Sequence, residues 1–233
     1  MDLKERDSLG EQADIYWYYV SKAAMVARKL PAGGRRVLDV GAGLGWFSRW
    51  MLENGVATEA TCVDPGYETE ETEAVDGKPI SYVKSVERFD ADTVLLMDVL
   101  EHVDDNIALL KEYWDKASSG TTFIITVPAF NFVWCAHDVH LEHRRRYTTK
   151  SLANTIKAAG AQPNQLHYFF ASIFPLAVAV RFLRRNADTS HSDLQPVHPL
   201  VNRVLTAICG IEAKAATWNK MAGLSVVARM TKP

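Results

Sequence analysis

The sequence predicts an α/β protein with a doubly wound sheet, and three observations lead to this prediction. Short apolar runs that suit buried strands alternate along the chain with longer segments that suit helices. The first of these runs, 36–40, leads directly into a glycine-rich turn that opens a helix. Acidic residues, Asp39 and Asp64, stand at the ends of the first two runs. Because parallel sheets bind ligands at the carboxyl ends of their strands, we expect a Rossmann-like sheet with its site at that edge.

Seven strands are expected in this sheet, each inferred from a short apolar run bounded by turn residues. The predicted strands span residues 36–40, 60–64, 80–83, 93–97, 121–127, 166–171 and 223–230.

Helices are expected in most of the intervening segments, where apolar residues recur three or four positions apart. They are predicted at 12–30, from the glycine turn to about 54, from a cap at Asp104 or Asp105 to about 117, at 149–159 and at 199–218. Residues 31–34 (Pro-Ala-Gly-Gly) end the first helix. The acidic segment 66–79 is expected to be a solvated loop or a short helix, and 186–196 a polar linker.

Length and composition favour one ordinary globular domain over residues 1–233, with 48% hydrophobic and 23% charged residues. The net charge of −2 argues against a general nucleic-acid binder. Three widely spaced cysteines, Cys62, Cys135 and Cys209, fit neither a disulfide framework nor a zinc site, so we expect a cytoplasmic protein. Met1 to Gly10 lacks an apolar signal core, and the apolar run 173–185 is too short and interrupted to be a transmembrane segment.

The glycine turn itself discriminates between ligands. Gly41, Gly43 and Gly45 have the spacing G-x-G-x-G, whereas the dinucleotide fingerprint is G-x-G-x-x-G. The negative charge of the Asp39 carboxylate would repel a pyrophosphate, whereas it suits a cationic or amino-bearing ligand. An NAD-dependent oxidoreductase is therefore the less favoured alternative.

A fourth strand that runs into Asp98-Val99-Leu100-Glu101-His102-Val103 completes a recognisable set of motifs. Together with the glycine turn, Asp39 and Asp64, it resembles class I S-adenosylmethionine-dependent methyltransferases, in particular the broad subgroup with a Leu-Glu-His fourth motif. The resemblance implies an antiparallel last strand, a helical insertion at 172–222 that roofs the active site, and S-adenosylmethionine as cofactor. It also implies the cofactor-binding residues, which are Asp39, Gly41, Gly43, Gly45, Asp64, Pro65, Ser85, Val86, Met97 and Asp98. Many relatives carry an aspartate near Ser85, and serine would hold the adenine amino group more weakly.

Four histidines lie in two segments that leave strands at the expected ligand edge, and imidazole can accept a proton near neutral pH. These are His102, His137, His140 and His143. We favour His143 or His140 as the base that deprotonates the methyl acceptor, with His102 as a positioning group. No resident metal is expected. In the alternative, Asp98, Glu101, His102 and a loop histidine would bind Mg²⁺, Mn²⁺ or Zn²⁺, since Asp98-x-x-Glu101-His102 is similar to the E-x-x-E-H metal site of plant small-RNA and ubiquinone-pathway O-methyltransferases.

The acceptor is expected to be a small molecule with a hydroxyl and a lipid-linked or aromatic part, because Phe130, Phe132 and Trp134 would give its cavity apolar walls. Arg144 to Arg146 are either a solvated loop or a binding site for an anionic part of that acceptor. Peripheral contact with a membrane is compatible with the apolar 168–183 segment. The aromatic helix 12–30 either packs in the core or lends a ring or hydroxyl to the cofactor mouth. An RNA or protein methyltransferase and a binding-only protein are the remaining alternatives.

Overall fold

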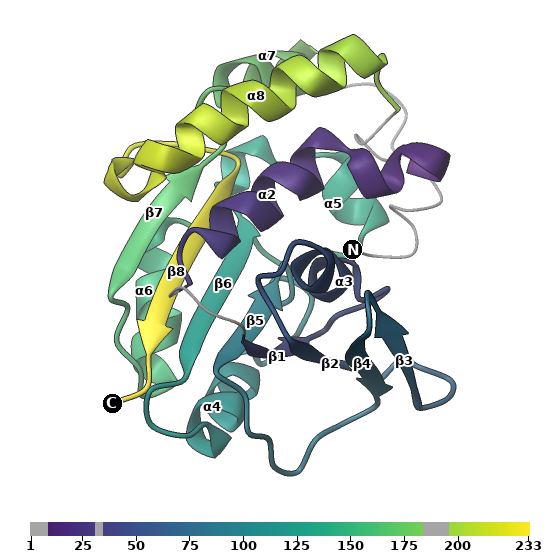
Figure 1. The fold of residues 1–233 in the computed structure, drawn as a ribbon. Coiled ribbons are helices and arrows are strands. Elements are labelled where there is room, and N and C mark those ends of the chain that lie inside the picture. The colour runs from purple at the N-terminus through teal and green to yellow at the C-terminus, as the bar shows by residue number, and fades with distance from the viewer. Residues whose placement is uncertain (1–8, 31–34, 184–195) are drawn as a thin grey trace.

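The computed structural model describes residues 9–30, 35–183 and 196–233, which form one eight-stranded sheet with the order β3-β4-β2-β1-β5-β6-β8-β7 (Figure 1). The strands β4, β2, β1, β5 and β6 run parallel, and β8 is antiparallel to both β6 and β7. The doubly wound, Rossmann-like fold with an antiparallel last strand is therefore confirmed. The strands are β1 (Arg36–Val40), β2 (Glu59–Val63), β3 (Glu71–Val75), β4 (Lys78–Val83), β5 (Thr93–Met97), β6 (Thr122–Pro128), β7 (Gln165–Phe169) and β8 (Ser225–Thr231).

The prediction of seven strands was wrong by one, because the segment 66–79 contains β3. This strand pairs antiparallel with β4 through a turn in which Asp76 and Gly77 both have positive φ, the geometry of a tight hairpin. β3 lies at the edge of the sheet, and four of its five residues are exposed. An edge strand with charged, solvated side chains lacks the apolar run that revealed the others.

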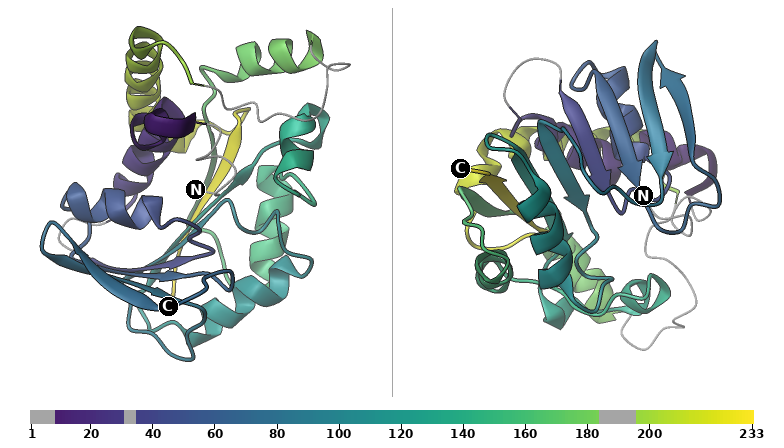
Figure 2. Two further views of the ribbon diagram at one scale, coloured as in Figure 1. Left: turned by 90° about the vertical axis from the view of Figure 1, so that its right-hand side faces the viewer. Right: turned by 90° about the horizontal axis from the view of Figure 1, so that it is seen from below.

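Helices cover both faces of the sheet, as the two views in Figure 2 show. One face is covered by α2 and α3, with α8 packed beyond α2, and the other by α4 and α6. The α-helices are α2 (Trp17–Ala27), α3 (Trp46–Glu53), α4 (Asn106–Lys116), α5 (Ala136–His140), α6 (Thr149–Ala158), α7 (Phe174–Leu183) and α8 (Pro199–Ala215). Three short 3₁₀ helices are η1 (Gly10–Ile15), η2 (Asn131–Val133) and η3 (Ala216–Trp218).

The helix predicted at 12–30 is divided in two. η1 ends at Ile15, and the extended backbone of Tyr16, with ψ of 128°, separates it from α2. The amide of Asn202 on α8 bonds both sides of this break: its oxygen accepts from the Trp17 N–H and its NH₂ donates to the Ile15 carbonyl, each at 2.8 Å. Three predicted segments lie wholly or mostly outside the described residues. They are Met1–Gly10, 31–34 and the 186–196 linker.

α7 and α8 stand between β7 and β8 in the chain and form the outermost layer of the molecule in Figure 1. Since β7 runs parallel to β6, its carboxyl end lies at the same edge as the glycine turn, and α7 starts there five residues later. Among the described residues, no helix is both long enough and apolar enough to cross a bilayer.

Candidate active site

The glycine turn follows β1 directly and holds its backbone in the left-handed region. The φ angles there are 66°, 53° and 67°, at Gly41, Gly43 and Gly45. The Gly41 N–H donates to the Val63 carbonyl at 2.7 Å, so the turn is tied to the end of β2. A Cβ on Gly41 would lie 2.8 Å from a methyl group of Val99. The turn thus forms a tight bend at the start of α3 in which a side chain at Gly41 would not fit, and the N–H groups of its three glycines are bonded within the protein.

Gly41→Ala is expected to lower the free energy of unfolding by about 2–4 kcal/mol, because left-handed backbone strain adds to overpacking against Val99. Urea unfolding measures this loss. Val99→Ala in the same chain makes room for the new methyl group, so the two changes together should cost less than their sum. A Gly41→Ala protein as stable as the wild type would contradict this description of the turn.

Asp64 follows β2 and faces the glycine turn. One carboxylate oxygen accepts from the Gly43 N–H and the other from the Gly66 N–H, each at 2.9 Å. The hydroxyl of Tyr67 donates to the Gly43 carbonyl at 2.7 Å, so the Asp64–Tyr67 loop lies against the turn. A ligand that bonds to Asp64 therefore either shares its carboxylate oxygens with these two N–H groups or displaces the Gly43 contact. Tyr67 was not identified from the sequence.

Asp39 lies at the end of β1 and is buried. Burial raises the pKa of its carboxyl group to about 6, although the Ser48 hydroxyl donates to it at 2.9 Å. Such a group is poised to change charge just below neutral pH, and a nearby cation would stabilise its ionised form.

The other predicted cofactor contacts occupy the same edge of the sheet but differ in exposure. Met97 ends β5 and is buried, whereas Pro65 and Ser85 are exposed after β2 and β4. Val86 packs against the core on the α4 and α6 side of the sheet, and its carbonyl accepts from the Lys116 ammonium at 3.0 Å. Their contacts with a cofactor stay predictions.

Asp98 has a partner that the sequence did not reveal. The ammonium of Lys22, whose side chain is fully buried on α2, contacts the Asp98 carboxylate and donates to the Tyr18 hydroxyl at 2.7 Å. The other Asp98 oxygen accepts from the Thr126 hydroxyl at 3.1 Å. Burial alone would raise the pKa of Asp98, but Lys22 and Thr126 outweigh it and hold that pKa below its usual range. The backbone of Asp98 has φ of 58°, a region that non-glycine residues rarely adopt.

The predicted histidine loop contains a dyad. Nδ1 of His143 lies 2.8 Å from a carboxylate oxygen of Asp138, and both side chains are buried. The buried guanidinium of Arg146 donates to the same carboxylate at 2.6 and 2.9 Å. Burial raises the pKa of Asp138, but the bonds from His143 and Arg146 outweigh it and hold that pKa well below its usual range. An ionised Asp138 can only accept, so Nδ1 of His143 is the donor and Nε2 is left to accept a proton.

Glu101, His102 and His143 meet beside this dyad. One ligand atom from each lies within 4.8 Å of the other two, and the rings of His102 and His143 have centroids 4.7 Å apart. Glu101 is fully buried, and neither of its carboxylate oxygens has a hydrogen-bond partner among the described residues. Burial and then the charge of Asp98 raise the pKa of Glu101 well above its usual range. A buried carboxyl group of this kind either holds a proton or meets a cationic ligand.

The structure also places the other residues predicted for this region. His140 ends α5 and is not part of the group of three, so of the two favoured bases only His143 joins His102. Of the three arginines only Arg146 is buried, whereas Arg144 is exposed and Arg145 is half-buried, although both are bonded to protein groups. Arg144 donates to the His102 carbonyl and pairs with Asp104, and Arg145 donates to the Asp104 carbonyl. These bonds clamp the histidine loop to the segment after β5.

A cavity of about 680 Å³ opens on one side of the glycine turn. Gly43, Trp46, Tyr67 and Tyr82 line it, and it extends along β3 as far as Glu73. No histidine of the dyad region lines it. Because it leads away from Asp98 and His143, we do not assign it to the reacting groups.

The sequence of residues 16–166 matches the methyltransferase domain family, and the chain belongs to that family. S-adenosylmethionine is therefore its methyl donor, and the oxidoreductase alternative is wrong. The residues fit this cofactor, since the glycine turn lets a ligand approach the backbone closely and two carboxylates, those of Asp39 and Asp64, lie beside it. No curated protein matches the sequence significantly.

Solved structures share the fold at low sequence identity. The partner of the Trm112 methyltransferase activator of Haloferax volcanii has a TM-score of 0.60 and 16% identity, over 98% of this chain and 94% of the other. A SAM-dependent methyltransferase of Archaeoglobus fulgidus has a TM-score of 0.55 and 16% identity, over 93% and 94%. CalO1, a methyltransferase of calicheamicin biosynthesis in its SAH-bound form, has a TM-score of 0.50 and 17% identity, over 64% and 50%.

The raised pKa of Asp39 has two opposite consequences with pH. Because its folded pKa of about 6 exceeds the ordinary 3.8, the contribution of Asp39 to stability should fall as pH rises from about 4 to 6. Affinity for the sulfonium cofactor should instead rise through pH 6, because the ionised carboxylate attracts the cation. Calorimetry at pH 5, 6 and 7 measures the affinity, and Asp39→Asn should remove both trends. Equal pH trends in the wild type and the variant would contradict a role for Asp39.

Proposed function

We propose that this methyltransferase acts on a hydroxyl group of a small, partly apolar acceptor, with His143 as the base. The observation that supports this most is the dyad, in which Asp138 holds Nδ1 of His143 at 2.8 Å and leaves Nε2 for the acceptor. The dyad lies in the loop after β6, and Asp98 directly follows β5, the strand that pairs with β6. A base beside the predicted methionine end of the cofactor is the arrangement that O-methylation needs.

When bound, S-adenosylmethionine would supply an activated methyl group, whose carbon bonds to the acceptor oxygen while its bond to the sulfonium sulfur breaks and S-adenosylhomocysteine leaves. His143 takes the hydroxyl proton on Nε2 as the new carbon–oxygen bond forms. Asp138 orients the ring and stabilises its protonated form, and Arg146 in turn keeps Asp138 ionised. Glu101 is fully buried and lies beside His102 and His143, and we place the acceptor against this group, where water is excluded.

The acceptor is proposed to be apolar rather than anionic. Phe130 stacks on Tyr168 with ring centroids 4.9 Å apart, and Phe132 and Trp134 are exposed in the part of the histidine loop that precedes α5. The arginines that would bind an anion are already bonded to protein groups. With a net charge of −2, these bonds also disfavour the RNA alternative.

A second candidate role is supported by one observation, the unpartnered carboxylate of Glu101 beside two imidazoles. Carboxylate and imidazole ligands suit Zn²⁺ or Mn²⁺, which would lower the pKa of a bound acceptor hydroxyl. Asp98 would not be a ligand, because Lys22 engages it. If a metal takes part, turnover stops after treatment with a chelator and returns when one specific metal is added. If His143 acts as the base without a metal, the chelator has no effect on turnover.

The acceptor is best found with methyl-labelled cofactor and mass spectrometry of labelled products, using aqueous and lipid extracts in parallel. The proposal predicts one labelled ether from the lipid or aromatic fraction, absent with His143→Asn. Label on RNA or protein, or label that is independent of His143, would overturn it.

A further inference from the structure

The outermost layer of the molecule carries an exposed apolar surface. Most of the large apolar side chains exposed in the described part of the chain belong to α7, α8 and η3 and the residues just after them. We define the cap face as Leu176, Val180, Phe182, Leu183, Leu200, Val201, Val204, Ile208, Ile211, Trp218 and Met221. The exposed fraction reaches 84% for Trp218 and 88% for Met221, which is unusual for side chains of this size.

α8 is apolar on two opposite sides. Its inner side buries Cys209 and Ala213 and packs on α2. Its outer side carries Val204, Ile208 and Ile211, which recur at helical spacing and are exposed. An apolar helix side is normally buried against another surface, so we expect a partner on the outer side of α8.

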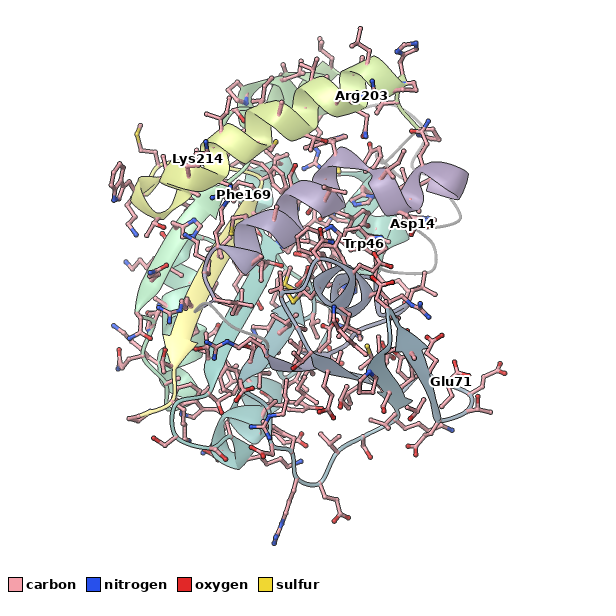
Figure 3. The ribbon with its side chains drawn as sticks, in the orientation of Figure 1. Asp14, Trp46, Glu71, Phe169, Arg203 and Lys214 are labelled. Atoms are coloured by element: carbon pink, nitrogen blue, oxygen red, sulfur yellow. The ribbon has the colours of Figure 1, made fainter. Side chains whose placement is uncertain are left out.

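The charge beside the cap face is positive. Arg203 and Lys214 are exposed and eleven residues apart, three turns of one helix, which places them along the same side of α8 (Figure 3). Lys220 is also exposed. The acid of α8, Glu212, is turned inward, where its carboxylate accepts from the Ala171 and Ser172 N–H groups at 2.7 and 3.0 Å. A local positive rim is notable in a chain whose net charge is −2.

The cap face continues into the histidine loop. The ring of Phe174 at the start of α7 lies 5.5 Å from Phe130 and 6.3 Å from Phe132, measured between centroids. The guanidinium of Arg181 donates to the Val133 carbonyl at 3.3 Å, which fixes α7 on η2. The exposed apolar surface therefore leads from α7 to the loop that carries His143.

We propose that the cap face docks on the anionic surface of a lipid bilayer. An apolar helix face with a basic rim and an exposed tryptophan has the chemistry that inserts into the headgroup region of such a surface. A second copy of the chain is a poorer partner, since a symmetric contact would bring Arg203 and Lys214 against the same residues of the copy. Docking would present an apolar acceptor from the bilayer to the histidine loop, a consequence that rests on the proposed function.

The test is co-sedimentation of the full chain with phosphatidylcholine vesicles that either contain or lack phosphatidylglycerol. We expect binding that requires the anionic lipid and weakens in high salt. Ile208→Asp with Ile211→Asp, and separately Arg203→Ala with Lys214→Ala, should each weaken binding about tenfold. The matched controls, Ile107→Asp on α4 and Lys150→Ala with Lys157→Ala on α6, should leave it unchanged.

Circular dichroism shows whether each variant is folded, and calorimetry with S-adenosylmethionine should give the same affinity in all of them. A failure of cofactor binding would count against the proposed function, whereas failure to bind vesicles with normal cofactor affinity overturns only the docking. Equal vesicle binding by the cap and control variants would also overturn it. So would a wild type that ignores vesicles but forms a dimer that Ile208→Asp with Ile211→Asp dissociates.

Discussion

Replacing His143 with asparagine is expected to lower kcat by about two to four orders of magnitude, the usual contribution of a positioned base. Asparagine can still donate to Asp138 and fill much of the space, so the loop should keep its structure. The cofactor Kd should not change, because no predicted cofactor contact belongs to this loop. Single-turnover kinetics with the acceptor from the labelling screen measures the chemical step.

His140→Asn is the matched control, since His140 lies three residues away and outside the group of Glu101, His102 and His143. Its kcat should stay within about threefold of the wild type, as expected for a residue that takes no part in proton transfer. A large loss with His140→Asn and none with His143→Asn would contradict the assignment of the base. The pH profile of kcat separates a base from a structural residue, because only the loss of a base removes one limb of that profile.

Replacing Lys22 with methionine is expected to lower the free energy of unfolding by about 3 kcal/mol, the low end for breaking a buried ion pair. The reason is that Asp98 would keep a charge in a buried site without its counter-ion. Lys22 has no exposed side-chain area, whereas 24% of the Asp98 side chain is exposed, so water offsets part of the loss. Urea unfolding gives the value, and cofactor affinity should fall with it because Asp98 loses its fixed position.

The double variant Lys22→Met with Asp98→Asn removes both charges and should be more stable than Lys22→Met alone. The exposed pair Lys111–Asp115 on α4 is the control, and Lys111→Met should cost less than about 1 kcal/mol. If Lys22→Met and Lys111→Met had equally small effects, the buried pair would not be holding α2 over the site.

Most of the sheet could be predicted from the sequence because its central strands are covered on both faces and read as unbroken apolar runs. β5 is the clearest case, with all five of its residues buried and bounds that agree with the prediction. β3 could not be predicted in this way, since its glutamates face solvent at an edge. The Asp76–Gly77 pair was the available signal, and it is a common hairpin turn.

The site could be predicted only where it consists of one local motif. The glycine turn and Asp64 are such motifs, but the dyad depends on which of three nearby histidines reaches Asp138, since His137 is buried as well. Asp138 selects His143 through a bond across the end of α5, which spacing alone does not predict. Lys22 was missed, and Arg146 was noted only as part of a run of three arginines, because a basic residue is normally solvated and only the tertiary structure supplies their buried carboxylate partners.

A crystal structure with S-adenosylhomocysteine tests the central claim most directly. We predict that the ribose hydroxyls bond to Asp64, which releases the Gly43 N–H, and that the sulfur faces Nε2 of His143 across an acceptor-sized space. A nucleoside bound away from Asp64 and the glycine turn, or a sulfur directed away from His143, would contradict it.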